Sequence, residues 1–285
     1  GLYDLRSEFD TQRKIYDAFN GRNDENSVWI RDGLCRLVAN VLFVEDSRWP
    51  NMFHPRVQAY NALVFEALTS EERQAFMTIY NDYFYERHNE MWGALAYRKL
   101  SMVLERTNML VTAEDLGVLP DCVQPTLDAL RILTLEVQTL PKQHGLEFAH
   151  LEANPYLSVA TISTHDMPPM RLWWQERPEA AQHYYRDRMQ KEGRPPVALT
   201  TTLAEEIVSR HLYSPSMLCL LSLQDWLAVD AEMRNPDPRS ERINIPGDCY
   251  NRWSYRMHVN IEQLIADEQL NKKLRTIVER SKRNV

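Results

Sequence analysis

Short apolar runs alternate with helical periodicity along much of the chain. Four of these runs are compact and are followed by polar segments or by segments that contain Gly and Pro. Uninterrupted apolar runs of this kind are typical of parallel strands that are buried on both faces. The sequence therefore predicts four buried strands, at Met109–Ala113, Thr134–Gln138, Val159–Ser163 and Met217–Leu223.

Helical patterns with recognisable starts lie between and after these runs. Thr69 with Glu72 and Thr202 with Glu205 have the spacing of a capping box, in which a hydroxyl and a carboxylate bond to each other's free amides. Apolar residues at helical spacing follow both sites, and a third stripe predicts one final helix. The three stripes are Phe76, Ile79, Tyr80, Tyr83 and Phe84; Leu203, Ile207 and His211; and Leu264, Ile265, Leu270, Leu274 and Ile277.

Strands that alternate with helices indicate an α/β fold. Right-handed crossovers would bring the carboxyl ends of the four strands to one edge, which is where the chemistry of such folds lies. Residues 1–68 are less regular, with a possible strand at Val41–Val44, and we expect them to form a mostly helical insertion or subdomain. Residues 69–285 are expected to form the main part of the fold.

Composition and charge narrow the functional classes. With 44% hydrophobic residues, the 285-residue chain is long enough to bury a core. The formal net charge of -7 provides no cationic field for a polyanion, so nucleic acid is not an expected partner. No apolar run approaches the roughly 20 residues that span a bilayer, so no membrane partner is expected either.

The cysteines and the first residue bear on where the protein resides. Cys35, Cys122, Cys219 and Cys249 are far apart and have no metal-ligand spacing, which favours a reducing compartment. We therefore expect a cytoplasmic protein. The chain begins at Gly1 rather than at methionine, so we expect a truncated start, and that start cannot report on a signal peptide.

Two of the predicted strands run directly into acidic residues. Glu114 and Asp115 follow the first strand, and His165 and Asp166 follow the third. Carboxyl groups at the edge of an apolar core often serve as general acids and bases, and pairs of them suit glycoside chemistry. The pattern alone more often indicates a helix cap or a solvated loop, because aspartate is a common cap.

Five segments resemble, in order, the fifth to eighth barrel strands and the following loop of glycoside hydrolase family 77, the amylomaltases and plant-type disproportionating enzymes. The first reads Ala-Glu-Asp-Leu-Gly-Val-Leu-Pro. The resemblance is strong from Tyr80 onward, and the segment before it is similar to the cytosolic plant-type branch. The five segments are Ala113–Pro120; Leu135–Gln138 with Leu140 and Pro141; Ser163–Asp166 with Arg171, Trp173 and Trp174; Leu223–Asp225; and Ile243–Gly247 with Asn251, Trp253 and Arg256.

The resemblance implies a fold and an activity. The fold would be the carboxy-terminal half of a TIM (β/α)8 barrel, with strands five to eight and their helices. The activity would be that of a 4-α-glucanotransferase, which transfers α-1,4-glucan or glucosyl units between maltooligosaccharides or glucans by a retaining double displacement. No metal and no other cofactor is implied.

The resemblance also implies roles for individual residues. Glu114 would be the catalytic acid/base, and Asp166 would hold the hydroxyls of the reacting glucose and stabilise its positive charge. The implied substrate-binding residues are His165, Asp115, Gln138, Trp173, Asn244, Asn251 and Trp253. Trp174 is a further plausible sugar contact, although a Trp at a strand end is often part of the core.

One departure from the family pattern is important. The family's nucleophile is an Asp in an Arg-Ile-Asp-His motif on the fourth strand, and no such motif occurs in this chain. We therefore expect the chain to be inactive alone, to need the missing amino-terminal part of the same polypeptide, and to self-associate through exposed strand edges. The alternatives are a non-catalytic glucan-binding or scaffolding unit and a related α-amylase-type hydrolase.

Overall fold

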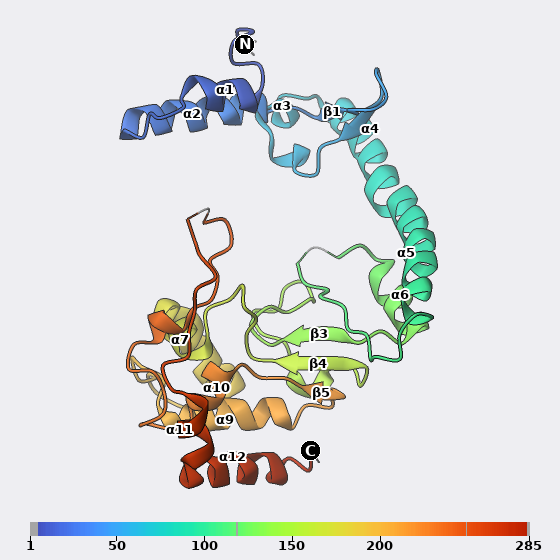
Figure 1. Cartoon of the computed structure of the whole chain (residues 1–285). Coiled ribbons are helices and arrows are strands. Elements are labelled where there is room, and N and C mark those ends of the chain that lie inside the picture. Colours follow the sequence, from blue (N-terminus) through green and yellow to red (C-terminus); the bar gives the residue numbers. More distant parts are fainter. Residues whose placement is uncertain (1–4, 118, 249, 284–285) are drawn as a thin grey trace. The chain divides into compact units, whose positions relative to one another are not determined.

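The computed structural model describes residues 5–117, 119–248 and 250–283 (Figure 1). The chain forms two compact units, Gly1–Trp92 and Gly93–Val285. The boundary between them lies within one long helix, α5 (His88–Leu104). Three residues mentioned above, Gly1, Val118 and Cys249, lie outside the described residues.

The first unit contains short helices and one antiparallel hairpin. The hairpin strands are β1 (Phe43–Glu45) and β2 (Phe53–Pro55), so the strand suggested at Val41–Val44 exists but begins two residues later, and its partner was not predicted. The other elements are α1 (Gln12–Ala18), α2 (Glu25–Val38), η1 (Ala59–Asn61), α3 (Leu63–Glu66), α4 (Ser70–Asn81) and a π-helical segment, η2 (Asp82–Arg87).

The start of α4 confirms the first predicted capping box. Thr69 Oγ1 accepts a hydrogen bond from Glu72 N, and the Glu72 carboxylate accepts one from Thr69 N. Phe76 and Tyr80 of the predicted apolar stripe are buried beside Ala59, whereas Ile79 is exposed. The buried face of this helix is therefore narrower than the predicted apolar stripe.

The second unit is built on a parallel sheet, which confirms the α/β class. Its strands are β3 (Thr134–Val137), β4 (Ser158–Thr161) and β5 (Leu218–Cys219), in the order β3-β4-β5, and β3 and β4 run side by side in the same direction (Figure 1). The first predicted strand is reduced to one parallel bridge between Thr112 and Leu133. All four segments therefore have their carboxyl ends at the same edge.

Three local predictions were wrong. Leu223–Asp225 lies in helix α10 (Leu223–Leu227), not in a strand, because the Ser222 hydroxyl caps a helix there. The cap of α9 (Thr201–Leu212) is Thr200, the first hydroxyl of a Thr-Thr-Thr run, not Thr202. The single final helix is two helices, α11 (Ile261–Ala266) and α12 (Glu268–Arg280), because the Asp267 side chain starts a new one.

Helices of the second unit pack on the sheet and on one another. Helix α9 packs against β4, and α12 packs against α9 (Figure 1). The predicted stripe of Leu203, Ile207 and His211 on α9 is buried, as expected. The other elements are α6 (Val123–Leu130), η3 (Leu151–Ala153), α7 (Met170–Glu176), α8 (Pro178–His183), η4 (Tyr184–Arg188) and η5 (Pro238–Glu241).

Two further observations concern the cysteines and the helices. Cys35 and Cys219 are free thiols. Across residues 5–117, 119–248 and 250–283, no helix combines the length and the apolar character that crossing a bilayer requires.

Candidate active site

The segment between β4 and α7 carries two of the predicted site residues. We call residues 163–170 the His165 loop. The His165 Nε2 atom lies 3.5 Å from the Asp166 Oδ1 atom, and the two side chains are 44% and 41% exposed. The loop follows the carboxyl end of β4, so both side chains lie at the edge of the sheet that the strand pattern predicted.

A second loop brings three more predicted residues to the same place. We call residues 241–248 and 250–253 the Asn244 loop. Asn244 Nδ2 donates a hydrogen bond of 2.5 Å to Asp166 Oδ1, and Asn251 Nδ2 donates one of 2.7 Å to Asn244 Oδ1. The Trp253 ring lies 5.0 Å from the His165 ring, centroid to centroid. His165, Asp166, Asn244, Asn251 and Trp253 thus form one contiguous cluster.

The chemistry of this cluster suits a polyhydroxylated ligand. Asp166 Oδ2 receives no hydrogen bond from the described residues, so it remains available as an acceptor. Trp253 is 64% exposed and offers an apolar ring face beside the polar groups. A carboxylate for hydroxyl groups and an aromatic face for the apolar side of a ring are complementary to a pyranose.

The end of the first predicted strand is arranged differently. Glu114 is exposed, whereas the adjacent Asp115 side chain is only 3% exposed. Asp115 Oδ1 accepts a hydrogen bond of 2.7 Å from Leu135 N, and its Oδ2 accepts one of 2.6 Å from Lys142 Nζ. Lys142 also bonds to Glu136 Oε1 at 2.7 Å. Both oxygens of Asp115 are therefore bonded within the protein, and they anchor the segment that carries Glu114 to β3.

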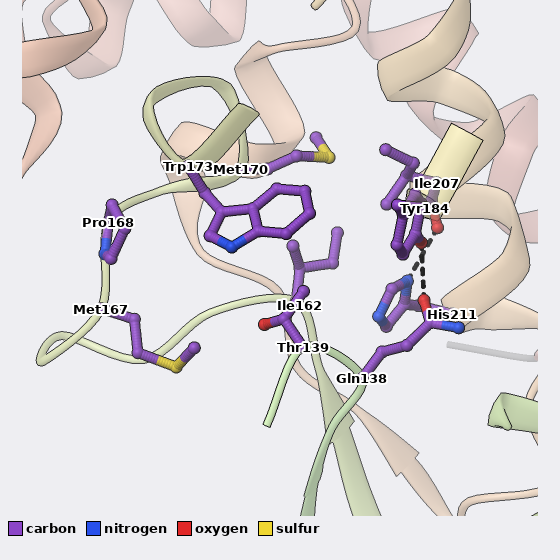
Figure 2. A pocket seen from close by; sticks show the side chains of 10 residues that line it. All are labelled: Gln138, Thr139, Ile162, Met167, Pro168, Met170, Trp173, Tyr184, Ile207 and His211. Atoms are coloured by element: carbon purple, nitrogen blue, oxygen red, sulfur yellow. Dashed lines mark hydrogen bonds between the residues drawn. The ribbon is translucent and has the colours of Figure 1, made fainter. Parts of the chain in front are cut away.

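Gln138 and Trp173 lie in a small buried pocket rather than in the cluster (Figure 2). Gln138 is 4% exposed, its Oε1 accepts from the Tyr184 hydroxyl at 2.6 Å, and its Nε2 donates to Ala149 O at 3.2 Å. Trp173 packs against Tyr184 with the ring centroids 5.8 Å apart. The pocket has a free volume of about 20 Å³, room for roughly one water molecule. Among the described residues, no hydrogen bond or ring contact joins either side chain to the cluster of Asp166.

Two other residues of this region belong to the core. Trp174 is fully buried and donates from Nε1 to Pro196 O, so it is not a sugar contact. His211 lines the same small pocket, and its Nδ1 donates to Ile207 O at 2.8 Å (Figure 2). Burial lowers the pKa of His211 to about 4, so the ring is neutral at physiological pH.

Sequence reasoning missed a group of buried polar side chains that lie behind the cluster. Asp225 and Gln224, at the start of α10, are 1% and 5% exposed. Asp225 accepts hydrogen bonds from both ends of the His165 loop, while Gln224 Nε2 donates to Glu241 O, at the start of the Asn244 loop. Burial raises the pKa of Asp225, and hydrogen bonds from Ser222, Met170 and Ser163 oppose that rise. The sequence held one signal, the Ser222-x-x-Asp225 spacing of a helix cap, but not its burial.

Arg171 and Glu241 form a second buried pair near these loops. Arg171 donates to Asn235 O at 2.7 Å, and its Nη1 atom lies 3.4 Å from Glu241 Oε2. Burial raises the pKa of Glu241 to about 7, and the Arg171 charge opposes this rise without cancelling it. The contact is long for an ion pair, so desolvation decides the direction of the shift.

Comparison with known proteins supplies a family for this arrangement. The sequence profile of the 4-alpha-glucanotransferases, glycoside hydrolase family 77, matches residues 27–262. The chain is 28% identical to the 4-alpha-glucanotransferase DPE2 of Oryza sativa subsp. japonica over 99% of this chain and 30% of that protein. It is 32% identical to the 4-alpha-glucanotransferase of Chlamydia muridarum (strain MoPn / Nigg) over 62% of this chain and 34% of that protein.

A solved structure also matches. The amylomaltase from Streptococcus agalactiae in complex with acarbose aligns with 68% of this chain and 35% of its own, at a TM-score of 0.49 and 18% identity. The chain spans about a third of the length of the curated relatives described here.

Proposed function

The chain belongs to the 4-alpha-glucanotransferase family, glycoside hydrolase family 77, and from this we propose that it supplies part of the active site of a 4-α-glucanotransferase. The reaction is the transfer of α-1,4-glucan or glucosyl units between maltooligosaccharides or glucans, with retention at the anomeric carbon. The fold in which this occurs is a (β/α)8 barrel, to which this chain contributes strands five to eight. Residues 1–68 are an insertion in that barrel, and the protein is cytoplasmic.

The observation that carries the proposal is the cluster around Asp166. Two segments distant in sequence, each similar to a family motif, bring a carboxylate, two amides, an imidazole and an exposed Trp together beyond the ends of parallel strands. This is where α/β barrels carry out their chemistry. A chance resemblance of short motifs would not predict that these side chains contact one another.

Glu114 is the acid/base of the reaction. It protonates the glycosidic oxygen as the bond from the anomeric carbon breaks and an Asp carboxylate forms an ester with that carbon. It then removes the proton from an incoming sugar hydroxyl, which attacks the anomeric carbon and displaces the Asp. Strand spacing supports this role, since two strand intervals of about 4.8 Å separate the Glu114 segment from β4 and leave room for a sugar ring.

Asp166 and its neighbours bind the glucose that reacts. The carboxylate of Asp166 accepts hydrogen bonds from ring hydroxyls and stabilises the positive charge that develops as the ring flattens. His165 and Asn244 bond to the same hydroxyls, and Asn244 also holds Asp166 in place. Trp253 stacks on the apolar face of a sugar, and Asn251 orients Asn244.

The nucleophile lies outside this chain, because its 285 residues contain no Arg-Ile-Asp-His motif. The chain is therefore inactive by itself and requires the amino-terminal part of the barrel, which covers the open strand edges that would otherwise pair with another copy. The natural partners are that part of the same polypeptide and a maltooligosaccharide or glucan.

The test is a disproportionation assay on the protein that carries both this chain and the nucleophile strand. Maltotriose should yield glucose and longer maltooligosaccharides, resolved by chromatography, with little gain in total reducing ends. A matching rise in reducing ends would indicate the hydrolase alternative, because water instead of sugar would be the acceptor. Binding of maltooligosaccharides without any product would indicate the glucan-binding alternative.

A further inference from the structure

One buried carboxylate is bonded to both ends of the His165 loop. Ser163, where the loop leaves β4, donates from its hydroxyl to Asp225 Oδ2 at 3.0 Å. Met170, where the loop enters α7, donates from its backbone N to Asp225 Oδ1 at 3.1 Å. Asp225 is 1% exposed, so these bonds are not exchanged for bonds to water.

Asp225 is itself fixed by the start of its own helix. The Ser222 hydroxyl donates to Asp225 Oδ2 at 2.8 Å and accepts from Asp225 N at 3.1 Å. The neighbouring Gln224 donates from Nε2 to Glu241 O at 3.2 Å. Two adjacent residues of α10 therefore hold the two loops whose contact, Asn244 to Asp166, forms the cluster.

We propose that Asp225 is a positioning residue that fixes the His165 loop, and through it Asp166, in the geometry that the transfer reaction needs. Asp225 touches neither a substrate nor the groups that react, so it acts through Ser163 and Met170. The inference rests on the proposed function for its catalytic consequence, but its structural content, a loop ordered by Asp225, is measurable without any activity.

The bonds made by Asp225 specify which substitutions remove its effect. Met170 N needs an acceptor, whereas the Ser163 and Ser222 hydroxyls can accept as well as donate. The amide of Asp225→Asn keeps an oxygen for Met170 N and offers an NH₂ group to the hydroxyls, so it preserves the loop. Asp225→Ala leaves Met170 N buried without its acceptor. The Met170 amide then moves away from its wild-type position.

The experiment compares these variants in the protein that carries this chain and the nucleophile strand. In Asp225→Ala, the Met170 amide should exchange with solvent about tenfold faster or more, the effect of losing one hydrogen bond to a charged group. Its kcat for maltotriose disproportionation should fall about 100-fold, with KM changed far less, because displaced groups act mainly on the transition state. Asp225→Asn should restore both quantities to within about threefold of wild type.

Asp230→Ala is the matched control. Asp230 accepts side-chain hydrogen bonds from two backbone amides, those of Glu232 and Met233, and from none of the described residues of either loop. It should lower thermal stability without altering Met170 exchange or kcat. Equal losses of kcat in Asp225→Ala and Asp230→Ala would overturn the proposal, since Asp225 would then contribute only stability.

The exchange measurement separates this inference from the proposed function. If the wild type transfers no glucan, the proposed function fails, yet Met170 exchange still decides whether Asp225 orders the loop. If Asp225→Ala does not fold, the two single variants Asp225→Asn and Ser163→Ala replace it. Ser163→Ala removes the bond from the Ser163 hydroxyl to Asp225 and leaves Met170 N bonded. Wild-type exchange of the amides of residues 164–167 in Ser163→Ala would overturn the proposal.

Discussion

The two strand ends that carry the proposed catalytic carboxylates are held in different ways. Asp166 belongs to a chain of contacts between two loops, and a buried carboxylate beneath it fixes both ends of its own loop. Glu114 is exposed, while the residues on either side of it are anchored: Ala113 N donates to Leu133 O, and Asp115 accepts from Leu135 N and Lys142 Nζ. This chain thus assembles the sugar-binding half of the proposed site, whereas the Glu114 side chain remains exposed.

The largest effect is expected at the less constrained end. Glu114→Gln should lower the transfer rate by about 10²–10⁴-fold, because general acid/base assistance contributes that much. The same protein should still bind maltooligosaccharides, since the Glu114 side chain is hydrogen-bonded to no other side chain among the described residues. Steady-state kinetics with calorimetric binding measures both, and a loss below tenfold would identify another residue as the acid.

The next effect tests the preassembled end. Asp166→Asn should lower kcat by about 10²-fold or more while raising KM much less, because its charge matters most when the glucose ring becomes cationic. Kinetics on a maltooligosaccharide provides the comparison. If KM rises while kcat is unchanged, Asp166 is only a binding residue.

Glu241, at the start of the Asn244 loop, tests whether the buried polar groups behind the cluster of Asp166 titrate. Its pKa of about 7 exceeds its ordinary value of 4.5, and Arg171, Arg234 and Asp225 are the charged groups that act on it. A carboxyl whose pKa is raised in the folded state binds more protons when folded than when unfolded. Glu241 therefore does not lower the free energy of unfolding below about pH 4.5, and it lowers this free energy progressively as the pH rises to about 7. Since each unit of difference in pKa corresponds to about 1.4 kcal/mol, the free energy of unfolding falls by up to about 3 kcal/mol.

Glu241→Gln should therefore flatten this part of the pH dependence. Thermal unfolding of the variant and the wild type between about pH 5 and pH 8 measures the difference. Glu232→Gln, an exposed position on a nearby segment, is the control and should decline in parallel with the wild type. A wild-type decline that persists unchanged in Glu241→Gln would show that Glu241 does not cause it.

The smallest effects separate two amides of the Asn244 loop. Asn244 bonds to Asp166 directly, while the Asn251 side chain bonds to Asn244. Asn244→Ala should therefore weaken maltooligosaccharide binding by about tenfold, the value of a hydrogen bond to a charged group, and Asn251→Ala by about threefold or less. Calorimetric titration ranks them, and the reverse order would contradict the arrangement of the cluster.

What the sequence could predict depended on whether the information was local. The apolar run Val159–Ser163 correctly predicted β4. The motifs gave His165, Asp166 and Asn244 as substrate contacts, and the structure brings these three side chains together. The run Met217–Leu223 was extended too far, since apolar character does not distinguish the end of a strand from the start of a helix capped by Ser222.

Burial was the information that the sequence lacked. Asp115 and Asp225 have the same side chain as Asp166, yet packing places them inside the protein, where they bond to backbone amides, while Asp166 remains accessible. Gln138 was expected at the substrate and is instead bonded to Tyr184 and to Ala149. These differences arise from contacts distant in sequence, which periodicity and local motifs do not report.

The most direct test of Glu114 as the acid/base uses a donor that needs no acid. In Glu114→Ala, maltotriose should not react, whereas α-maltosyl fluoride should, because fluoride leaves without a proton and the nucleophilic Asp forms its ester. Azide, which needs no base, should then attack the anomeric carbon, displace the Asp, and yield α-maltosyl azide. Recovery of that retained azide is the predicted result. Loss of fluoride turnover together with maltotriose turnover, with no azide product, would contradict the account.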